Sequence, residues 1–209
     1  MYALYYAPGS ASMAPHGVIE ETGAPYTLRR VDLAAGAQRD PEYLKLNPNG
    51  RVPTLTVDGA FAVYESAAIC LFLADRHPQA GLAPAIGEPA RGPYYQWLTY
   101  LTNTVQTSYL LYFYPEANTT NADQAPEIRA RGMELLTEQW RRLDQALAKG
   151  PYLLGDRFSA ADIYLHMLYS WRDPDLRLES DCPNVRRCAE LVAARPAIRR
   201  MLQQNEMAA

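Results

Sequence analysis

Two short segments place hydroxyl or carboxylate side chains at predicted helix starts. Ser10 and Ser12 follow a turn-forming Pro-Gly pair, and Glu65 and Ser66 directly precede an apolar run. At a helix start such side chains cap the free backbone amides. The same amides, at the positive end of the helix dipole, also bind anions. Both segments are therefore candidate anion-binding sites as well as candidate caps.

A third candidate is a dipeptide that precedes a β-prone run. Val52-Pro53 stands directly before Thr54-Leu-Thr-Val57. A cis bond before this proline would leave the amide and carbonyl of Val52 free to pair with an extended peptide, as an added strand does. The alternative is an ordinary trans proline at the first position of a strand.

The elements that must position these segments follow in a recognisable order. Strands are predicted where β-prone residues alternate, helices where apolar residues recur at helical spacing, and an Asp58-Gly59 turn joins two strands in a hairpin. Over the first 80 residues the order is βαβαββα, with strands at 2–6, 26–33, 54–57 and 60–64 and helices ending near 23, 46 and 77.

The rest of the chain has helical periodicity throughout. Residues 81–93 are rich in Pro, Gly and Ala and are predicted to be a linker. Helices are expected at 94–117, 124–149, 159–171 and 184–204, and Ser159-Ala-Ala-Asp162 is a capping box. We therefore expect two domains, 1–80 and an all-helical 94–209, joined by the linker.

Composition excludes several classes of protein. The 209 residues carry a net charge of −3 and no basic run, which argues against nucleic acid as a partner. No apolar run reaches the roughly 18 residues of a membrane span, and the N-terminus has no secretory signal pattern. The three cysteines lack the spacing of a disulfide framework or a zinc site. We expect a cytoplasmic protein without a metal.

The order of elements and four motifs resemble the cytosolic glutathione transferases. The motifs are Tyr5-Tyr-Ala-Pro-Gly-Ser10, Asn47-Pro-Asn-Gly-Arg-Val-Pro53, Tyr64-Glu-Ser-Ala-Ala-Ile69 and the capping box. The resemblance covers essentially the whole chain, and among the classes the chain is most similar to the bacterial beta class. It implies an α/β thioredoxin-like N-terminal domain, an all-α C-terminal domain and a homodimer.

The resemblance also implies a glutathione site along the edge of the first domain. Arg51, Val52 and Pro53 form the segment that pairs with the cysteinyl backbone of glutathione. Glu65 holds the ammonium of the γ-glutamyl group, and Ser66 with the helix amides binds its carboxylate. Glutathione is then a co-substrate, and no metal is required.

The first turn departs from the beta class, because Ala11 stands where those proteins usually carry Cys. Three hydroxyls remain as candidates to stabilise the glutathione thiolate: Ser12, which is slightly preferred, Ser10 and Tyr5. Ser12 matches the Ser after the beta-class Cys, Ser10 matches the Pro-Gly-Ser motif of insect delta-class enzymes, and Tyr5 matches the activating Tyr of the mammalian alpha, mu and pi classes. Lowering a thiol pKa from about 8.5 to near 6.5 requires about 2.7 kcal/mol of selective stabilisation of the anion.

A second departure lies on the first long helix of the predicted helical domain. Beta-class proteins carry a His-Lys pair where this chain has Gln106-Thr107. The resemblance implies a second-substrate pocket on this helix, formed by the polar and aromatic residues Tyr100, Asn103, Gln106 and Tyr109. Tyrosines at helical spacing are also typical of core packing.

The sequence therefore predicts a glutathione transferase that presents the glutathione thiolate to a small electrophile, in a detoxifying role. Two alternatives remain open at this point. One is a glutathione-dependent reductase, lyase or isomerase on the same scaffold. The other is a non-enzymatic glutathione-binding or regulatory protein that keeps the fold.

Overall fold

The computed structural model describes residues 1–207, which form two compact units. The first unit comprises Met1–Glu88 together with the described residues from Val192 onward, and the second comprises Pro89–Leu191. The expected domains, 1–80 and 94–209 with a linker at 81–93, stay a prediction about the parts of the chain that fold independently.

The first unit is built on a mixed four-stranded sheet with the strand order β2-β1-β3-β4. β1 pairs in parallel with β2 and antiparallel with β3, and β3 pairs antiparallel with β4. The strands are β1 (Tyr2–Tyr6), β2 (Tyr26–Arg30), β3 (Thr54–Val57) and β4 (Phe61–Tyr64). The predicted hairpin of 54–64 is confirmed, with its turn at Asp58 and Gly59, both at positive φ.

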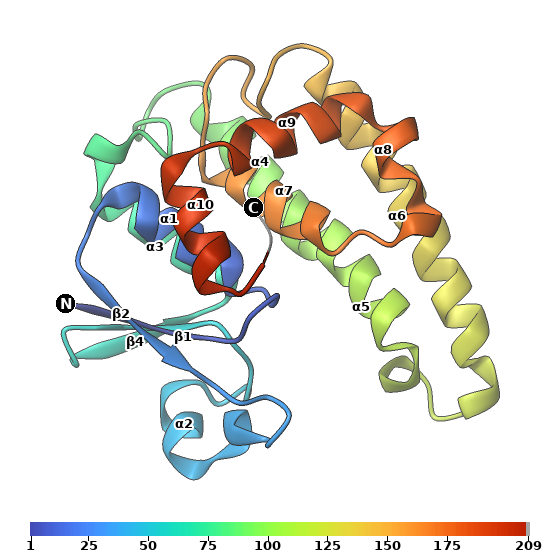
Figure 1. The fold of residues 1–209 in the computed structure, drawn as a ribbon, viewed down its shortest axis with the longest axis horizontal. Helices are drawn as coiled ribbons and strands as arrows, with labels where there is room; N and C mark the ends of the chain where they lie inside the picture. Colours follow the sequence, from blue (N-terminus) through green and yellow to red (C-terminus); the bar gives the residue numbers. More distant parts are fainter. Residues whose placement is uncertain (208–209) are drawn as a thin grey trace. The chain divides into compact units, whose positions relative to one another are not determined.

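Helices cover both faces of this sheet (Figure 1). On one face lie α1 (Met13–Thr22) and α3 (Ser66–Arg76), and on the other lies α2 (Pro41–Leu46). Because side chains alternate along a strand, Leu4 and Leu55 form a fully buried pair toward α1 and α3, whereas Tyr5 and its partner Thr54 point toward α2. The C-terminal α10 (Pro196–Gln204) packs on α1.

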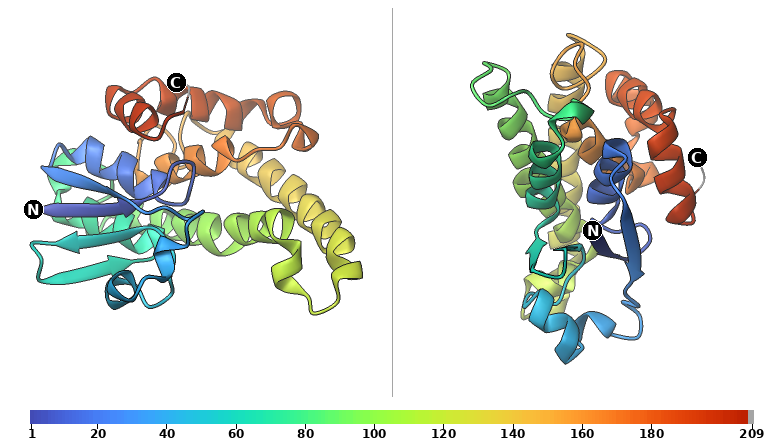
Figure 2. Two further views of the ribbon diagram at one scale, coloured as in Figure 1. Left: turned by 60° about the horizontal axis from the view of Figure 1, so that its bottom comes forward. Right: turned by 90° about the vertical axis from the view of Figure 1, so that its left-hand side faces the viewer.

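The second unit consists of helices only, apart from two isolated bridges among residues 152–157. Its α-helices are α4 (Arg91–Tyr100), α5 (Thr107–Phe113), α6 (Ala125–Leu147), α7 (Ala160–Ser170), α8 (Leu178–Asp181) and α9 (Pro183–Ala193), the last of which ends in the first unit. Helices α5 and α6 run side by side (Figure 2). Short 3₁₀ segments are η1 (Ala37–Arg39), η2 (Pro78–Ala80), η4 (Pro115–Asn118), η5 (Ala122–Gln124) and η6 (Pro174–Leu176).

The predicted fold class is confirmed, and so is the capping box that starts α7 at Ser159 and Asp162. Two details of the helical prediction are wrong. The expected helix 94–117 is interrupted by the π-helical segment η3 (Leu101–Gln106) and ends at Phe113. The expected helix 184–204 is two helices, because Pro196 lacks the amide that would continue the first and instead begins the second.

Candidate functional site

Three candidate segments leave the same end of the sheet in the first unit. Tyr5 of β1 is paired with Thr54 of β3, and Thr54 is paired with Tyr64 of β4. These three residues form one row across the sheet. The turn with the serines follows β1, the Val52-Pro53 segment precedes β3, and Glu65 follows β4. Strand register alone therefore brings the three segments together.

The turn after β1 holds its two serine hydroxyls in one small network. The hydroxyl of Ser12 donates to the carbonyl of Ala7 at 3.0 Å and accepts from the Ala7 amide at 3.4 Å. The hydroxyl of Ser10 lies 2.7 Å from both the Ala7 carbonyl and the Ser12 hydroxyl. Ser12 has 0% of its surface exposed, whereas Ser10 is only half-buried. Ser10 is therefore the more accessible of the two serines.

Tyr5 is separated from the two serines by the sheet itself. Its ring packs edge-on against Tyr43 of α2, with the centroids 5.7 Å apart. The serines lead into α1, which covers the opposite face. The structure thus brings Ser10 and Ser12 together and leaves Tyr5 on the α2 side.

The segment before β3 is held by residues that the sequence-based site did not include. The Val52-Pro53 bond is cis, the first of the two alternatives that the sequence left open. The Arg51 carbonyl accepts from the Asn47 amide at 2.8 Å and from the Tyr43 hydroxyl at 2.7 Å. Neither backbone group of Val52 is hydrogen-bonded to another described residue, so both are free for an added strand. Asn47 was visible as part of a motif, but its role depends on a contact across the loop.

Glu65 has an unusual backbone. Its φ is 70° and its ψ is 114°, a conformation that only glycine adopts without strain. Its side chain is exposed and makes no hydrogen bond or ion pair with any residue in 1–207. Ser66, the first residue of α3, is buried. Backbone strain of this kind collects at functional sites, where the fold holds it in place.

The four residues expected to form the second-substrate pocket do not share one face of the second unit. Tyr109 is fully buried in the core, where its hydroxyl accepts from the Trp140 indole at 3.2 Å and burial raises its pKa. Tyr100 is half-buried, and its hydroxyl oxygen has no partner among the described residues. Asn103 is exposed.

Gln106 differs from the other three because a hydrogen bond fixes the orientation of its side-chain amide. Its oxygen accepts from the Tyr164 hydroxyl of α7 at 2.5 Å. Gln106 closes the π-helical segment η3, and such segments often occur at functional sites. The π-helical turn had no signal in the sequence, because the apolar spacing of 94–117 also fits a regular helix.

Comparison with known proteins decides the family. The family model of the glutathione S-transferase N-terminal domain matches residues 11–76, and that of the C-terminal domain matches residues 126–187. Glutathione S-transferase GstA of Escherichia coli O157:H7 is 30% identical over 169 residues, which cover 80% of this chain and 81% of GstA. The chain belongs to the glutathione S-transferase family.

Solved glutathione transferases agree with this assignment over their full length. A homologue from Sulfitobacter with bound glutathione superposes with a TM-score of 0.91 at 29% identity, covering 100% of this chain and 99% of the homologue. A bacterial beta-class enzyme from Sphingomonas chungbukensis superposes with a TM-score of 0.84 at 29% identity, covering 99% of this chain and 100% of that enzyme. The predicted resemblance is therefore confirmed at the level of the family.

The cysteines of this glutathione S-transferase are poor candidates for chemistry. Cys70, Cys182 and Cys188 are free and buried. Burial raises the pKa of all three thiols, that of Cys182 to about 11, so none is an activated thiolate. Residues 1–207 contain no group of His, Cys, Asp and Glu arranged to hold a metal ion. Among the helices of residues 1–207, none combines the length and the apolar composition of a membrane span.

Proposed function

We propose that this protein is a glutathione transferase that binds glutathione at the end of the sheet in its first unit. The observation that carries the proposal is the row formed by Tyr5, Thr54 and Tyr64, which gathers the three candidate segments. Glutathione has a peptide backbone, an ammonium, two carboxylates and a thiol. Each of these groups has a chemical complement in the gathered segments.

The backbone of glutathione pairs with the free amide and carbonyl of Val52, as an added strand. The unpaired carboxylate of Glu65 binds the γ-glutamyl ammonium. The γ-glutamyl carboxylate is bound by Ser66 and the amides at the start of α3. The exposed Arg51, beside Val52 and Pro53, supplies a positive charge for the second carboxylate.

We assign thiolate stabilisation to the hydroxyl of Ser10. A hydroxyl has one proton, and that of Ser12 is donated to the Ala7 carbonyl. Ser10 can rotate its proton from the protein toward a bound sulfur, because it is half-buried. Replacing a neutral hydrogen bond by one to a thiolate stabilises the anion by about 1–1.5 kcal/mol, which corresponds to about one pKa unit. Ser12 then positions Ser10, and Tyr5 is the weakest of the three candidates.

In the proposed reaction the thiol proton passes to water, and the thiolate forms the new carbon–sulfur bond with the electrophile. In a substitution, the leaving group departs with the electron pair of its bond to carbon. In an addition, the displaced electron pair moves onto an atom of the electrophile, which then takes a proton from water. The electrophile binds on the second unit, for which the half-buried Gln106 and the exposed Asn103 are the candidates that can contact a ligand, with Tyr100 behind them. The fully buried Tyr109 supports the packing of that unit.

Calorimetric titration with glutathione and with its sulfonate analogue tests the binding site directly. When glutathione is present at about 100 times its dissociation constant, the free energy of unfolding should rise by about 2.7 kcal/mol. Ser66→Ala should weaken binding, and a panel of aryl halides, epoxides and unsaturated carbonyl compounds tests the transfer reaction. Binding without any turnover would favour the non-enzymatic alternative, and no binding would refute the proposal.

We further propose a cytoplasmic homodimer that detoxifies small electrophiles. The aromatic side chain of Phe61 on the edge strand β4 is 48% exposed and contacts Phe72 of α3 with the centroids 6.0 Å apart, so this ring pair leaves an apolar surface open. A second copy would cover this surface. Light scattering should report a dimer that Phe61→Arg dissociates. Ile86→Arg is the control, because Ile86 is an isolated apolar side chain that is 86% exposed; a monomeric parent protein contradicts the proposal.

A further inference from the structure

The buried His16 lies directly behind the turn that carries the serine hydroxyls. Its backbone amide donates to the carbonyl of Ser12 at 3.0 Å. Its ring meets the ring of Tyr6, the last residue of β1, with the centroids 6.1 Å apart. The side chain of His16 therefore contacts the residue that precedes the turn, and its backbone is bonded to the residue that ends it.

The ring of His16 is held from the C-terminal end of the chain. Its Nδ1 lies 2.9 Å from Nδ2 of Asn205, and its Nε2 lies 2.7 Å from Oε1 of Gln204 and 3.0 Å from the hydroxyl of Tyr26. The same Nδ2 of Asn205 also donates to the carbonyl of Met201 at 2.8 Å. Both ring nitrogens thus have partners, two of them from residues at the end of α10.

These contacts define the protonation state of the ring. An amide nitrogen only donates, so Nδ1 of His16 accepts from Asn205, and the ring proton is on Nε2, where it faces the Gln204 oxygen. Burial lowers the pKa of His16, which agrees with this neutral form. The network therefore requires a neutral imidazole in one tautomer.

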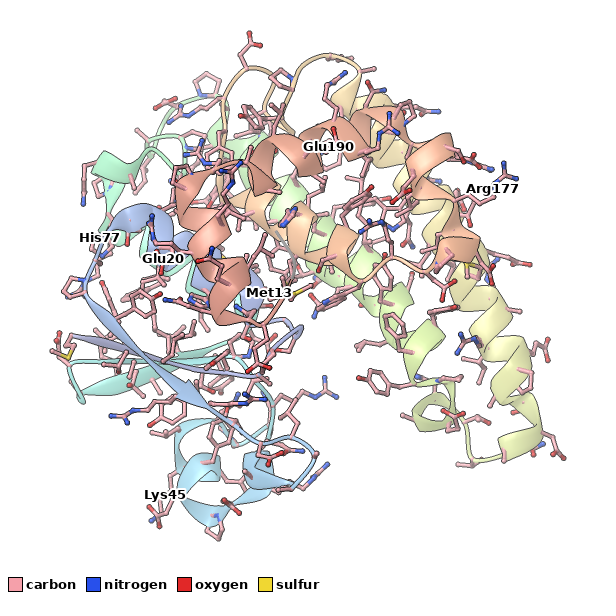
Figure 3. The ribbon with its side chains drawn as sticks, in the orientation of Figure 1. Met13, Glu20, Lys45, His77, Arg177 and Glu190 are labelled. Carbon is pink, nitrogen blue, oxygen red and sulfur yellow. The ribbon has the colours of Figure 1, made fainter. Side chains whose placement is uncertain are left out.

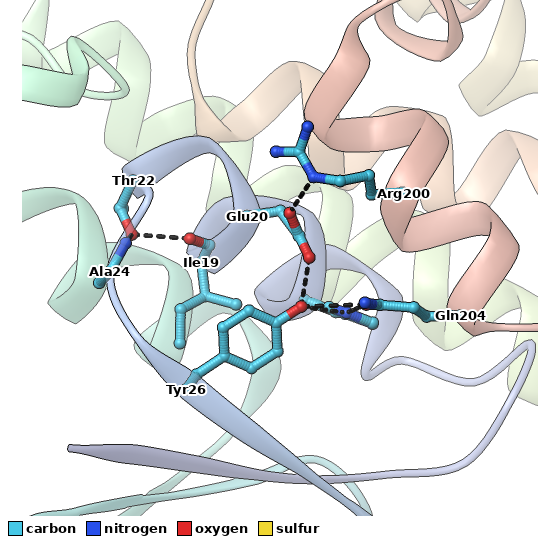
Figure 4. A network of polar contacts seen from close by, with 8 residues as sticks. Ile19, Glu20, Thr22, Ala24, Tyr26, Arg200 and Gln204 are labelled. Atoms are coloured by element: carbon cyan, nitrogen blue, oxygen red, sulfur yellow. Dashed lines mark hydrogen bonds and ion pairs between the residues drawn. The ribbon is translucent and has the colours of Figure 1, made fainter.

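Charged groups around the ring fix α10 on α1. Arg200 of α10 contacts Glu20 at 2.8 Å, and Glu20 also accepts a hydrogen bond from Tyr26 (Figure 4). Arg195 forms two bonds with Glu21, at 2.6 and 2.7 Å. The side chains of Glu20 and Glu21 are 8% and 10% exposed, so these pairs are shielded from solvent on the carboxylate side. Figure 3 shows Glu20 beside α10.

We propose that His16 and Asn205 are positioning residues for thiolate activation: the end of α10 fixes the imidazole, and the imidazole fixes the turn that presents Ser10. The inference rests on the proposed function. Ser10 and Ser12 both bond to the Ala7 carbonyl, so a small displacement of the Ser12 backbone moves both hydroxyls. The glutathione-binding groups of Val52 and Glu65 lie on other segments and do not depend on His16. Loss of the C-terminal contact should therefore impair activation of the thiol more than its binding.

The test compares Asn205→Ala with Gln203→Ala. Gln203 is two residues away, is exposed and makes no side-chain hydrogen bond or ion pair with any described residue, so it is a matched control. The ultraviolet absorbance of bound glutathione thiolate, followed against pH, measures the apparent pKa of the thiol. Asn205→Ala should raise this pKa by about half a unit or more, while the glutathione dissociation constant changes less than about threefold. The control should match the parent protein in both measurements.

A thiol pKa in folded Asn205→Ala equal to that of the control overturns the proposal, and so does a loss of binding without a change in pKa. Should Asn205→Ala fail to fold, Gln204→Ala decides, since it removes one ring partner from an exposed position while Tyr26 still bonds to Nε2. Gln204→Ala should raise the thiol pKa by less than about half a unit. An unchanged thiol pKa in this variant overturns the proposal. Absence of glutathione binding in the parent protein would instead refute the proposed function.

Discussion

Replacing Glu65 by glycine should make the protein more stable and a weaker glutathione binder. The backbone at this residue, with φ at 70° and ψ at 114°, is strained for any side chain. Such strain costs about 1–3 kcal/mol, which glycine avoids. Glycine also gains conformational freedom in the unfolded chain, which costs about 0.5–1 kcal/mol. The free energy of unfolding should therefore rise by about 0.5–2 kcal/mol, because the strained term is the larger.

Loss of the Glu65 carboxylate should weaken the binding of glutathione. A hydrogen bond to a charged partner contributes about 1.5–3 kcal/mol, so glutathione affinity should fall by about 10- to 150-fold. Because the Glu65 side chain makes no hydrogen bond or ion pair with the described residues, its removal breaks no such interaction in the folded protein.

Two controls separate the two effects. Glu65→Ala removes the carboxylate and keeps the strain, so it should bind as weakly as Glu65→Gly without the gain in stability. Glu65→Gln keeps the shape of the side chain and loses its charge. Urea denaturation measures stability and calorimetric titration measures affinity. A glycine variant no more stable than the alanine variant would refute the strain argument, and unchanged affinity in all three variants would refute the binding role.

Three further predictions concern the first turn, the helical packing and the pH dependence. Ser10→Ala should raise the apparent pKa of the bound thiol by about one unit, measured from the pH–rate profile, and Ser12→Ala should raise it less; the reverse order assigns the hydrogen bond to Ser12. Gly132→Ala should lower the free energy of unfolding by about 1–3 kcal/mol, because a Cβ there would lie 2.9 Å from the amide nitrogen of a residue on α5. The control Gly92→Ala, with nothing within 4 Å, should not destabilise the protein in the same denaturation experiment. Burial lowers the pKa of His166 from 6.5 to about 4, so between these pH values the folded protein binds fewer protons than the unfolded chain. The free energy of unfolding should therefore fall as the pH drops from about 6.5 to 4, and His166→Met should make that fall smaller.

Residue spacing alone predicted the site only as three separate segments, and it was the family resemblance that joined them into one glutathione site. Ser10, Val52 and Glu65 stood out because their neighbours carry local signals for a turn, a strand start and a helix start. Their meeting at one end of the sheet depends on the register of Tyr5 with Thr54, and no local signal fixes that register. The burial of Ser12 likewise follows from packing around the turn and not from its position in a motif.

The residues predicted to bind the second substrate show the same difference between local sequence signals and tertiary packing. Helical spacing predicted that one helix carries Tyr100, Asn103, Gln106 and Tyr109. It did not predict which of them are buried. The π-helical turn between Leu101 and Gln106 rotates the residues after it relative to those before it. Tyr109 then enters the core and Asn103 remains exposed. Apolar periodicity could not detect one added residue in a helical turn.

Residue spacing was sufficient to predict the order of the elements, the hairpin and the capping box at Ser159, because each depends on residues a few positions apart. The same spacing left both a cis and a trans bond before Pro53 open, and the structure has the cis bond. What lies behind the turn that carries Ser10 and Ser12 depends instead on tertiary packing. His16 and Asn205 are 189 positions apart, and their hydrogen bond exists because α10 returns to pack on α1. Interactions between residues so distant in the chain depend on how whole elements pack, and local propensities carry no information about that packing.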